Sequence, residues 1–353
     1  MGNTAPVFNG TTLHFRGIRI IEASLKKLAA IGGLNRATSV VLTGFSHGGT
    51  MALLHADRIG ASLRRMNSAD GLQHFGVVPA DAAHPLYRSL WGTKFPSLSK
   101  GWYAAALQAN AALSNATAAV SDGCKAKHPA TEQWRCLFAN EAMAFVQSPL
   151  FLVQQIPAVW DLQCALDGLP SGNILQVGCS THNESMLTLT KCVQYPDRCD
   201  PAVVAKFMVP LQRQQLREFA ESAIATKPTT GQFFHHCYLG AYFEEAFGTT
   251  NESKVPRAFD SVWNQISIDG LTMREAIDTW WLSATSTNGT RSLRISARGE
   301  KKPLSLLHAD TPWDPTRKAP EYRAPWTGKK DPPVPWWTSR FMSNPSCQGY
   351  PWY

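Results

Sequence analysis

The 353-residue sequence lacks any apolar run long enough to cross a bilayer, so we predict no membrane span. It has no Cys-x-x-Cys pair and no Cys/His spacing of a zinc site, and we expect no metal and no cofactor. It also lacks a nucleic-acid-binding motif, although its formal net charge is +8. The positive excess, concentrated toward the C-terminus, suits solubility or an acidic polysaccharide rather than nucleic acid.

A secretory signal peptide is also missing, because residues 1–10 have neither a basic stretch nor an apolar core. Pro6 stands where an N-myristoylation signal requires Ser or Thr. An even number of cysteines and several Asn-x-Ser/Thr sequons nevertheless favour disulfides and the secretory pathway. We therefore expect a secreted or extracellular protein, in a chain that lacks its natural start. The cysteines are Cys124, Cys136, Cys164, Cys179, Cys192, Cys199, Cys237 and Cys347, and the sequons begin at Asn9, Asn115, Asn183, Asn251 and Asn288.

The most informative motif is Gly-Phe-Ser-His-Gly-Gly at residues 44–49. It follows residues 39–43, an apolar run typical of a strand, and precedes residues 50–59, which we expect to be helical. A strand, a Gly-x-Ser-x-Gly turn and a helix together form the context of a nucleophile elbow. The alternative is a Gly-rich connection between strand and helix that carries no chemistry.

In an elbow, each residue of this turn has a physical task. We expect Gly44 and Gly48 to leave room for the sharp bend, so that the Ser46 hydroxyl stands clear at the end of the strand. The backbone N–H of His47 would lie at the helix N-terminus, where the helix dipole favours an oxyanion. The motif thus predicts Ser46 as a nucleophile and His47 as an oxyanion donor.

Apolar runs and amphipathic segments along the chain predict further strands and helices. The first helix is amphipathic, with Ile21, Leu25 and Leu28 on one face, and Gly32 and Gly33 end it. Residues 124–136 are expected to form a loop bounded by two cysteines. The expected helices cover residues 17–32, 101–118, 201–226 and 256–282, and the further strands cover residues 150–153, 173–177 and 231–238.

The composition changes near residue 292, beyond which Pro, Trp and basic residues dominate. Such a segment cannot hold a regular helix or strand for long. We assign residues 1–291 to one domain and residues 292–353 to a basic, Pro/Trp-rich tail, which packs on the domain or is disordered. Stacking of its tryptophans on sugar rings is the functional alternative.

A serine nucleophile needs a histidine base and a carboxylate that orients it, in the chain order Ser, acid, His for this fold type. Asp161 follows the strand at residues 150–153 and is our candidate acid, with Asp167 as a second choice. His236 is the candidate base, and the adjacent His235 is the alternative. An Asp after a strand is also typical of a turn, and paired histidines also occur in structural roles. Asp278 is expected to be a solvated helix position.

From Thr11 to Trp281 the chain resembles the pectin acetylesterases and their animal relatives, the Notum carboxylesterases. The resemblance rests on several segments that stand in the family's order. They are residues 13–20, the elbow at residues 43–50 with Leu53, Leu54, Asp57 and Arg58 after it, residues 78–81, 148–154 and 233–238, and the C-terminal signatures at residues 277–281 and 344–347. The resemblance implies an α/β-hydrolase-like fold, a mostly parallel sheet flanked by helices.

The chain departs from the family at three places. A gapless match puts the family's catalytic Asp on Ala158, so Asp161 serves only if the loop is shifted by three residues. The family's His falls on Gly240, so His236 or His235 would act from another backbone position. The family's Gly-Gly-x-Trp-Cys segment, part of its oxyanion hole, is absent from the 45 residues before Ser46, as are the first strands of the sheet. The esterase domain is therefore expected to be incomplete at its N-terminus, or else degenerate.

Two functions follow from this sequence. The first is a secreted serine carboxylesterase that removes acetyl or acyl groups from a polysaccharide or a related ester, acting as a monomer. The second is a catalytically impaired binding protein on the same scaffold, which the Gly at position 240 favours. A weaker third reading is an interaction protein that acts through the basic tail.

Overall fold

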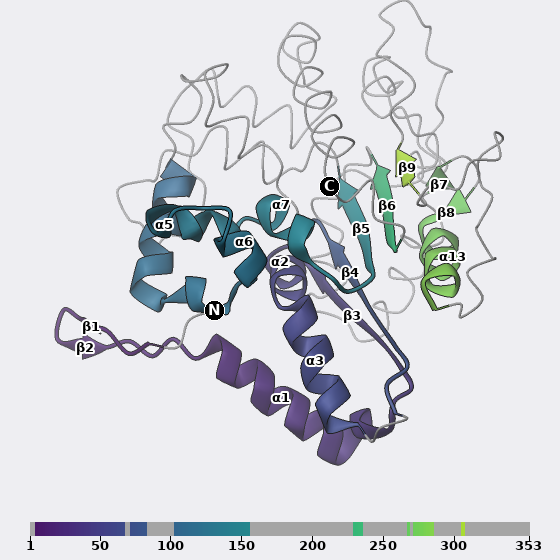
Figure 1. Cartoon of the computed structure of the whole chain (residues 1–353), viewed down its shortest axis with the longest axis horizontal. Coiled ribbons are helices and arrows are strands. Elements are labelled where there is room, and N and C mark those ends of the chain that lie inside the picture. The colour runs from purple at the N-terminus through teal and green to yellow at the C-terminus, as the bar shows by residue number, and fades with distance from the viewer. Residues whose placement is uncertain are drawn as a thin grey trace, which may run out of the picture.

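The computed structural model describes residues 4–67, 71–82, 102–155, 229–235, 267–268, 271–285 and 305–307. Its centre is a five-stranded sheet with the order β3-β4-β5-β6-β9, and all four neighbouring pairs are parallel (Figure 1). The strands are β3 (Ser39–Phe45), β4 (His74–Ala80), β5 (Leu150–Gln155), β6 (Thr230–His235) and β9 (Ser305–Leu307). The predicted strands at residues 39–43, 150–153 and 231–238 thus correspond to β3, β5 and β6. The strand expected at residues 173–177 and the helix expected at residues 201–226 lie outside the described residues.

Helices cover both faces of this sheet, which confirms the predicted α/β class. Alternate strand residues point to opposite faces, so Leu152 and Phe234 join one buried cluster while Phe151 and Phe233 join another. The first cluster includes side chains of α2 (His47–Leu54), α3 (Ala56–Met66) and α7 (Ala139–Ala142), and the second includes those of α13 (Met273–Thr285). Each large apolar side chain buried in this way contributes about 1.5–3 kcal/mol.

The second strand of the sheet, β4, has no counterpart among the predicted elements. All but the first of its residues are buried, but Pro79 interrupts its sequence pattern. Proline cannot donate to a strand ladder, and the pairs that join β4 to β5, Val77 with Leu150 and Ala80 with Val153, lie on either side of it. Because of this proline, the sequence pattern alone does not predict β4, although β4 lies between β3 and β5 in the sheet.

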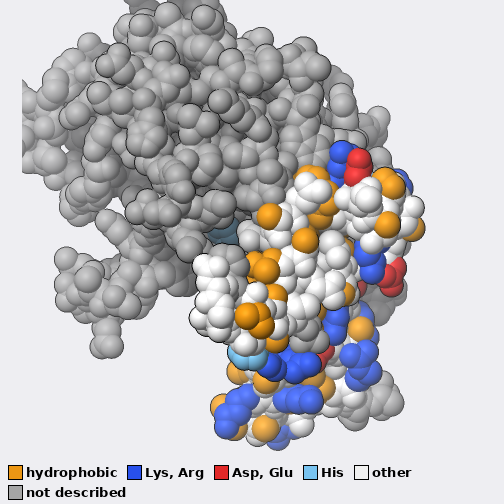
Figure 2. All heavy atoms as spheres, turned by 90° about the vertical axis from the view of Figure 1, so that its left-hand side faces the viewer, with side chains coloured by type: hydrophobic (Ala, Val, Ile, Leu, Met, Phe, Trp, Pro, Cys, Tyr) orange, Lys and Arg blue, Asp and Glu red, His pale blue; other side chains and the backbone are white. Residues whose placement is uncertain are grey.

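The first helix is α1 (Gly17–Gly32), as predicted, and Gly33 ends it in the left-handed region with φ 71°. A hairpin of β1 (Val7–Phe8) and β2 (Thr11–Thr12) precedes it, and the short 3-10 helix η1 (Leu34–Arg36) follows. Ile21 and Leu25 pack against the core, but Leu28 is 50% exposed, so only two of the three residues expected on the inner face lie there. Figure 2 shows hydrophobic side chains among Lys and Arg on the lower part of the described surface, where α1 lies.

The sequence predicted one helix over residues 50–59, but the structure has two helices there, so the prediction of a continuous helix was wrong. The break is at His55 (φ −108°, ψ 6°), which joins α2 to α3 without a glycine or proline. The two helices pack on the same face of the sheet, and the ring of His55 is 1% exposed between them. Neither ring nitrogen has a hydrogen-bond partner among the described residues. Glu22 and Arg58, which form an ion pair of 2.9 Å, line the same small pocket as His55.

The burial of His55 predicts a pH-dependent stability. Burial, followed by the neighbouring positive charges including Arg58, lowers the pKa of His55 to about 4 from 6.5. His55 takes up a proton near pH 6.5 in the unfolded chain and only near pH 4 in the folded chain. The free energy of unfolding is therefore highest above pH 6.5 and falls as the pH drops from 6.5 to 4. The total loss is about 3 kcal/mol. Between pH 7 and pH 4.5, the free energy of unfolding measured in urea should fall less in His55→Leu than in wild type. An equal fall in the two proteins would refute the prediction.

The last described helix begins with a capping box. Thr272 donates its N–H to the Glu275 carboxylate at 2.8 Å, and the Glu275 N–H donates to the Thr272 hydroxyl at 3.2 Å. Before this helix, β7 (Ser267–Ile268) and β8 (Leu271–Thr272) form an antiparallel pair. The helix expected at residues 256–282 was therefore wrong where these two strands lie. The Trp280 indole donates to the carbonyl of Thr229 at 3.0 Å, which fixes α13 to the start of β6.

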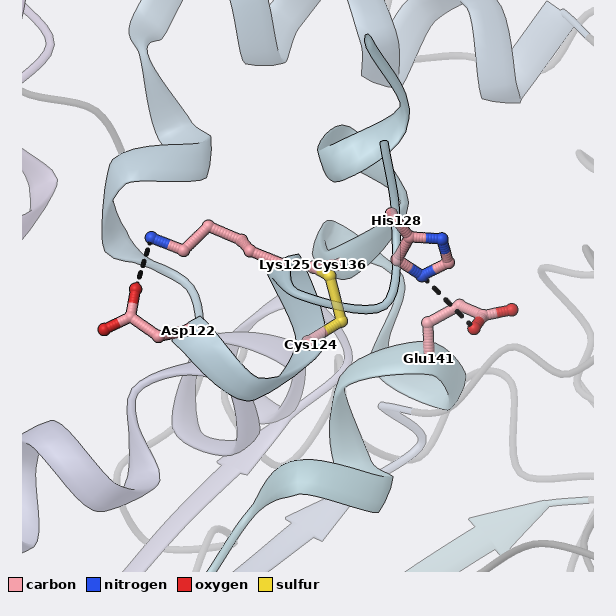
Figure 3. The surroundings of a disulfide bond; sticks show 6 residues. All are labelled: Asp122, Cys124, Lys125, His128, Cys136 and Glu141. Carbon is pink, nitrogen blue, oxygen red and sulfur yellow. Dashed lines mark ion pairs between the residues drawn. A yellow bond between two sulfur atoms is a disulfide. The ribbon is translucent and has the colours of Figure 1, made fainter. Parts of the chain in front are cut away.

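A group of short helices between β4 and β5 packs around a disulfide. Cys124 and Cys136 are bonded and fully buried, together with Ala111, Val120 and Leu137 (Figure 3). The predicted helix at residues 101–118 corresponds to α5 (Trp102–Ser114), whereas the expected loop at residues 124–136 is largely helical. The elements are α5, η2 (Ala116–Ala119), α6 (Asp122–Lys125), η3 (Ala130–Leu137) and η4 (Met143–Phe145). Among the described helices, none is long and apolar enough to cross a bilayer.

One carboxylate ties this group to the first half of the sheet. Asp57 of α3 accepts the backbone N–H of Gln147 at 2.9 Å and that of Ser148 at 2.8 Å, as well as the Ser148 hydroxyl at 2.7 Å. These bonds hold the chain just before β5. Since bonds to a charged group contribute about 1.5–3 kcal/mol, Asp57→Asn should lower the free energy of unfolding by about 2 kcal/mol.

Urea denaturation measures that loss, and Asp278→Asn provides the matched control. Asp278 is 68% exposed and pairs with Arg274 only at 3.8 Å, so its replacement should change stability by less than about 0.5 kcal/mol. Equal effects of the two substitutions would show that the Asp57 contacts contribute little.

Candidate active site

Ser46 lies in the turn between β3 and α2, where the chain reverses from the sheet into the helix. Its backbone has φ 53° and ψ −123°, a combination that non-glycine residues rarely adopt. Such a conformation costs about 1–3 kcal/mol and persists only where the surroundings impose it. The residue is partly exposed. The structure thus has the strand, tight turn and helix that the motif predicted around Ser46, and it adds that the backbone of the turn is strained.

Hydrogen bonds of the Ser46 backbone and of Thr50 hold this turn in place. The Ser46 N–H donates to the carbonyl of Ala80, at the end of β4, at 2.9 Å, and the Thr50 N–H donates to the Ser46 carbonyl at 2.9 Å. The Thr50 hydroxyl lies 3.2 Å from the Ser46 carbonyl and 3.2 Å from the Ala82 carbonyl. The turn is therefore fixed both to its own helix and to the end of the neighbouring strand.

Close backbone packing makes two glycines of the turn necessary. A Cβ on Gly44 would collide with the Gly48 carbonyl and lie 2.8 Å from the Gly49 nitrogen, and a Cβ on Gly49 would lie 2.7 Å from the Ala80 oxygen. A Cβ on Gly48 would meet no described atom within 4 Å. The expectation was right for Gly44 but wrong for Gly48, because Gly49 is the residue that faces the adjacent strand.

His47 is the first residue of α2 and is exposed, as is Gly48. The first N–H groups of a helix have no acceptor within the helix, and the helix dipole places partial positive charge there. An oxyanion formed beside Ser46 would therefore lie against the positive end of α2. This is the arrangement that the sequence predicted for the His47 N–H.

The other predicted catalytic residues, Asp161 and His236, lie outside the described residues, as does Asp167. His235 is the last residue of β6, and only its backbone is described. Because β3, β5 and β6 are parallel, the segments that follow β5 and β6 leave the sheet at the same edge as Ser46. The triad remains a prediction, with each member in a segment that begins at this edge. Asp278 is a solvated position of α13, as expected.

Sequence reasoning did not assign a role to Asp81, which directly follows β4 at the same edge. It is partly exposed, its φ is 46°, and its N–H donates to the Val153 carbonyl of β5 at 2.9 Å. The signal that indicates it is the apolar run before it, which ends a strand beside the elbow strand.

Among the described residues, the one group with ligand-type atoms close enough for a metal is Cys124, His128 and Cys136, within 4.8 Å of one another. The two sulfurs are joined in the disulfide, and a nitrogen of His128 lies 3.9 Å from the Glu141 carboxylate (Figure 3). Metal ligation by cysteine requires a thiolate, so this group is a disulfide with a neighbouring ion pair rather than a metal centre.

The parallel sheet covered by helices on both faces, with a strained serine turn at its carboxyl edge, defines an α/β-hydrolase-like protein. The pectinacetylesterase family model matches residues 1–293. The chain therefore belongs to the pectinacetylesterase family, and the resemblance read from its sequence is confirmed.

Individual relatives match smaller parts of the chain. Pectin acetylesterase 5 of Arabidopsis thaliana is 29% identical over 162 residues, which cover 45% of this chain and 33% of that protein. Palmitoleoyl-protein carboxylesterase notum2 of Xenopus laevis is 27% identical over 157 residues, 43% of this chain and 30% of that protein. These matches span about a third of the relatives' length. The crystal structure of the Wnt deacylase Notum from Drosophila covers 81% of this chain and 65% of its own, at 18% identity and a TM-score of 0.46.

Proposed function

We propose that the protein is a serine carboxylesterase that removes acetyl or other acyl groups from a polysaccharide or a related ester. The observation that carries this proposal is the backbone of Ser46, held at φ 53° between β3 and α2 by hydrogen bonds to α2 and to the end of β4. Strain of this kind is maintained at functional sites, where it positions a reactive group. Membership of the pectinacetylesterase family supports the same chemistry.

The proposed reaction has two steps. The Ser46 hydroxyl attacks the ester carbonyl while His236 takes its proton, and Asp161 orients and stabilises the resulting imidazolium. The His47 N–H stabilises the tetrahedral oxyanion. The alcohol leaves with the proton from His236, and water then hydrolyses the acyl-enzyme by the same route in reverse. Neither a cofactor nor a metal takes part.

The names of two relatives indicate which acyl groups members of the family remove. One relative is named a pectin acetylesterase and another a palmitoleoyl-protein carboxylesterase, so the family includes short and long acyl groups. We favour an acetylated polysaccharide because the net charge of +8 suits an acidic polymer.

The test measures hydrolysis of an aryl acetate, an aryl palmitate and acetylated pectin by the same purified protein. The proposal expects release of acetate from both acetyl esters and little release of palmitate. A folded protein that binds pectin but releases no acid from any ester would instead establish the second candidate, a binding protein. The observation that favours that candidate is the presence of Ala158 and Gly240 at the positions where the family's catalytic Asp and His fall in a gapless match.

We also propose that the protein is secreted as a glycosylated, disulfide-bonded monomer. The Cys124–Cys136 disulfide is of the kind that persists in oxidising compartments. The sequon residues Asn9 and Asn115 are both exposed in left-handed turns. Protein collected from the medium of eukaryotic cells should lose mass with an N-glycosidase, and an unchanged mass would contradict this assignment.

A further inference from the structure

The first helix, α1, carries large apolar side chains on the side that faces solvent. Ile20 is 63% exposed, Leu28 50% and Ile31 70%, whereas Ile21 and Leu25 on the opposite side pack against the core. No residue of this helix is buried. An open depression on the solvent side is lined by α1 itself, and we call its lining residues, together with Ile31, the outer face of α1. They are Ile20, Ala23, Ser24, Lys27 and Leu28.

Basic residues share the outer face with the apolar ones. Residues three, four, seven or eleven positions apart lie on one side of a helix. Arg16, Ile20, Lys27 and Ile31 therefore form one row along α1, and Lys26 is exposed beside this row. Figure 2 shows this mixture, with hydrophobic side chains next to Lys and Arg on the lower part of the described surface.

The positive charge of α1 has little negative charge near it in the sequence. Glu22 is the only acidic residue of the helix, and its carboxylate forms an ion pair of 2.9 Å with Arg58 of α3. The outer face is thus both apolar and positively charged. The basic residues in and next to the helix are Arg16, Arg19, Lys26, Lys27 and Arg36.

An anionic lipid surface is the partner that uses both properties. A helix that lies in a membrane interface buries its apolar side at the boundary of the acyl chains, while its Lys and Arg residues meet the headgroups. Against an acidic polysaccharide the isoleucines would stay in water and add no binding free energy. Against a second copy of α1 the basic residues of two helices would face each other, and such like-charge contacts oppose association.

We propose that the outer face of α1 docks the protein on a lipid bilayer that carries anionic headgroups. Ile20, Leu28 and Ile31 enter the boundary between headgroups and acyl chains, and Lys26 and Lys27 bind the headgroups. With 16 residues, α1 is about 24 Å long and lies along the surface rather than across the bilayer. The docking does not depend on ester hydrolysis, because these residues are outside the turn that carries the proposed nucleophile.

The test is sedimentation of the full chain with vesicles. Wild type should bind vesicles of equal parts phosphatidylcholine and phosphatidylserine, and should bind pure phosphatidylcholine much more weakly. Ile20→Ser with Ile31→Ser should weaken binding to the mixed vesicles about 10²-fold, because two apolar side chains no longer leave water. Lys26→Gln with Lys27→Gln should weaken it about tenfold. The affinity of wild type should also fall as salt rises from about 0.1 M to about 1 M.

Leu282→Ser is the matched control. Leu282 is also apolar and 62% exposed, but it belongs to α13, on the other face of the sheet. Its replacement should leave vesicle binding unchanged. All three variants should keep the wild-type thermal midpoint, because the replaced side chains are exposed.

The remaining outcomes would overturn the docking. If folded wild type binds no vesicles, or if both double variants keep its affinity, α1 does not bind lipid. If the lysine variant loses binding while the isoleucine variant keeps it, and polygalacturonate competes with the vesicles, the surface binds polyanions rather than a membrane. If wild type forms dimers that the isoleucine variant does not form, the outer face is an interface between two copies.

Discussion

Replacing Ser46 with alanine should abolish ester hydrolysis and leave the fold intact. Loss of a serine nucleophile lowers kcat by about 10⁶-fold in enzymes that work through a catalytic triad. Ala and Ser have similar backbone preferences, and the bonds that fix the turn involve only the backbone of residue 46. The thermal midpoint should therefore change little. The measurement is kcat/KM for an aryl acetate together with thermal unfolding of the same preparation.

The matched control for this variant is Ser24→Ala, on the exposed surface of α1. It should retain wild-type activity within experimental error. If Ser46→Ala kept more than a tenth of the wild-type rate, the hydrolysis would not depend on this serine.

The second large effect is expected from Gly44→Ala. The added Cβ would collide with the Gly48 carbonyl and lie 2.8 Å from the Gly49 nitrogen, both of them backbone atoms that cannot move away alone. Either the elbow shifts or β3 does, and overpacking of this kind costs about 3 kcal/mol. A displacement of the nucleophile by about 1 Å is enough to lower the rate about 10²-fold. Urea unfolding and aryl acetate hydrolysis should both report the loss.

Gly48→Ala separates this steric effect from a general intolerance of alanine in the turn. A Cβ at this position meets no described atom within 4 Å, and alanine favours a helix over glycine by about 0.8–1 kcal/mol. Stability should be unchanged or slightly higher, and activity should stay within a few-fold of wild type. Equal damage in both variants would mean that the packing around Gly44 is not what shapes the elbow.

Features set by neighbouring residues could be predicted from the sequence. The periodicity of α1 and the glycine that ends it lie within one segment, and the helix begins and ends where the pattern predicted. The strand before Ser46 and the turn itself were predicted for the same reason, since apolar run, glycines and helix are adjacent in the chain.

Features set by distant contacts could not be predicted in this way. The break at His55 has no local sequence signal and comes from the packing of two helices on the sheet. Gly49 is required because it faces Ala80 and Ala82, residues about thirty positions later in the chain. The position of Asp81 beside Ser46 depends on the pairing of β4 with β3, and Pro79 obscures that strand.

The base and acid of the site depend on the same kind of distant contact. Ser46 is identified by its own turn, whereas Asp161 and His236 were chosen by chain order and by the strands that precede them. The parallel order of β3, β4, β5 and β6 agrees with that choice as far as the ends of the strands.

The most direct test of the account is to treat the folded protein with a fluorophosphonate and locate the adduct by peptide mass spectrometry. An activated serine reacts covalently with such a probe, whereas an ordinary surface serine does not. The account predicts a single adduct on Ser46 that is absent from Ser46→Ala. A folded protein with no adduct, or with an adduct on another residue, would contradict it.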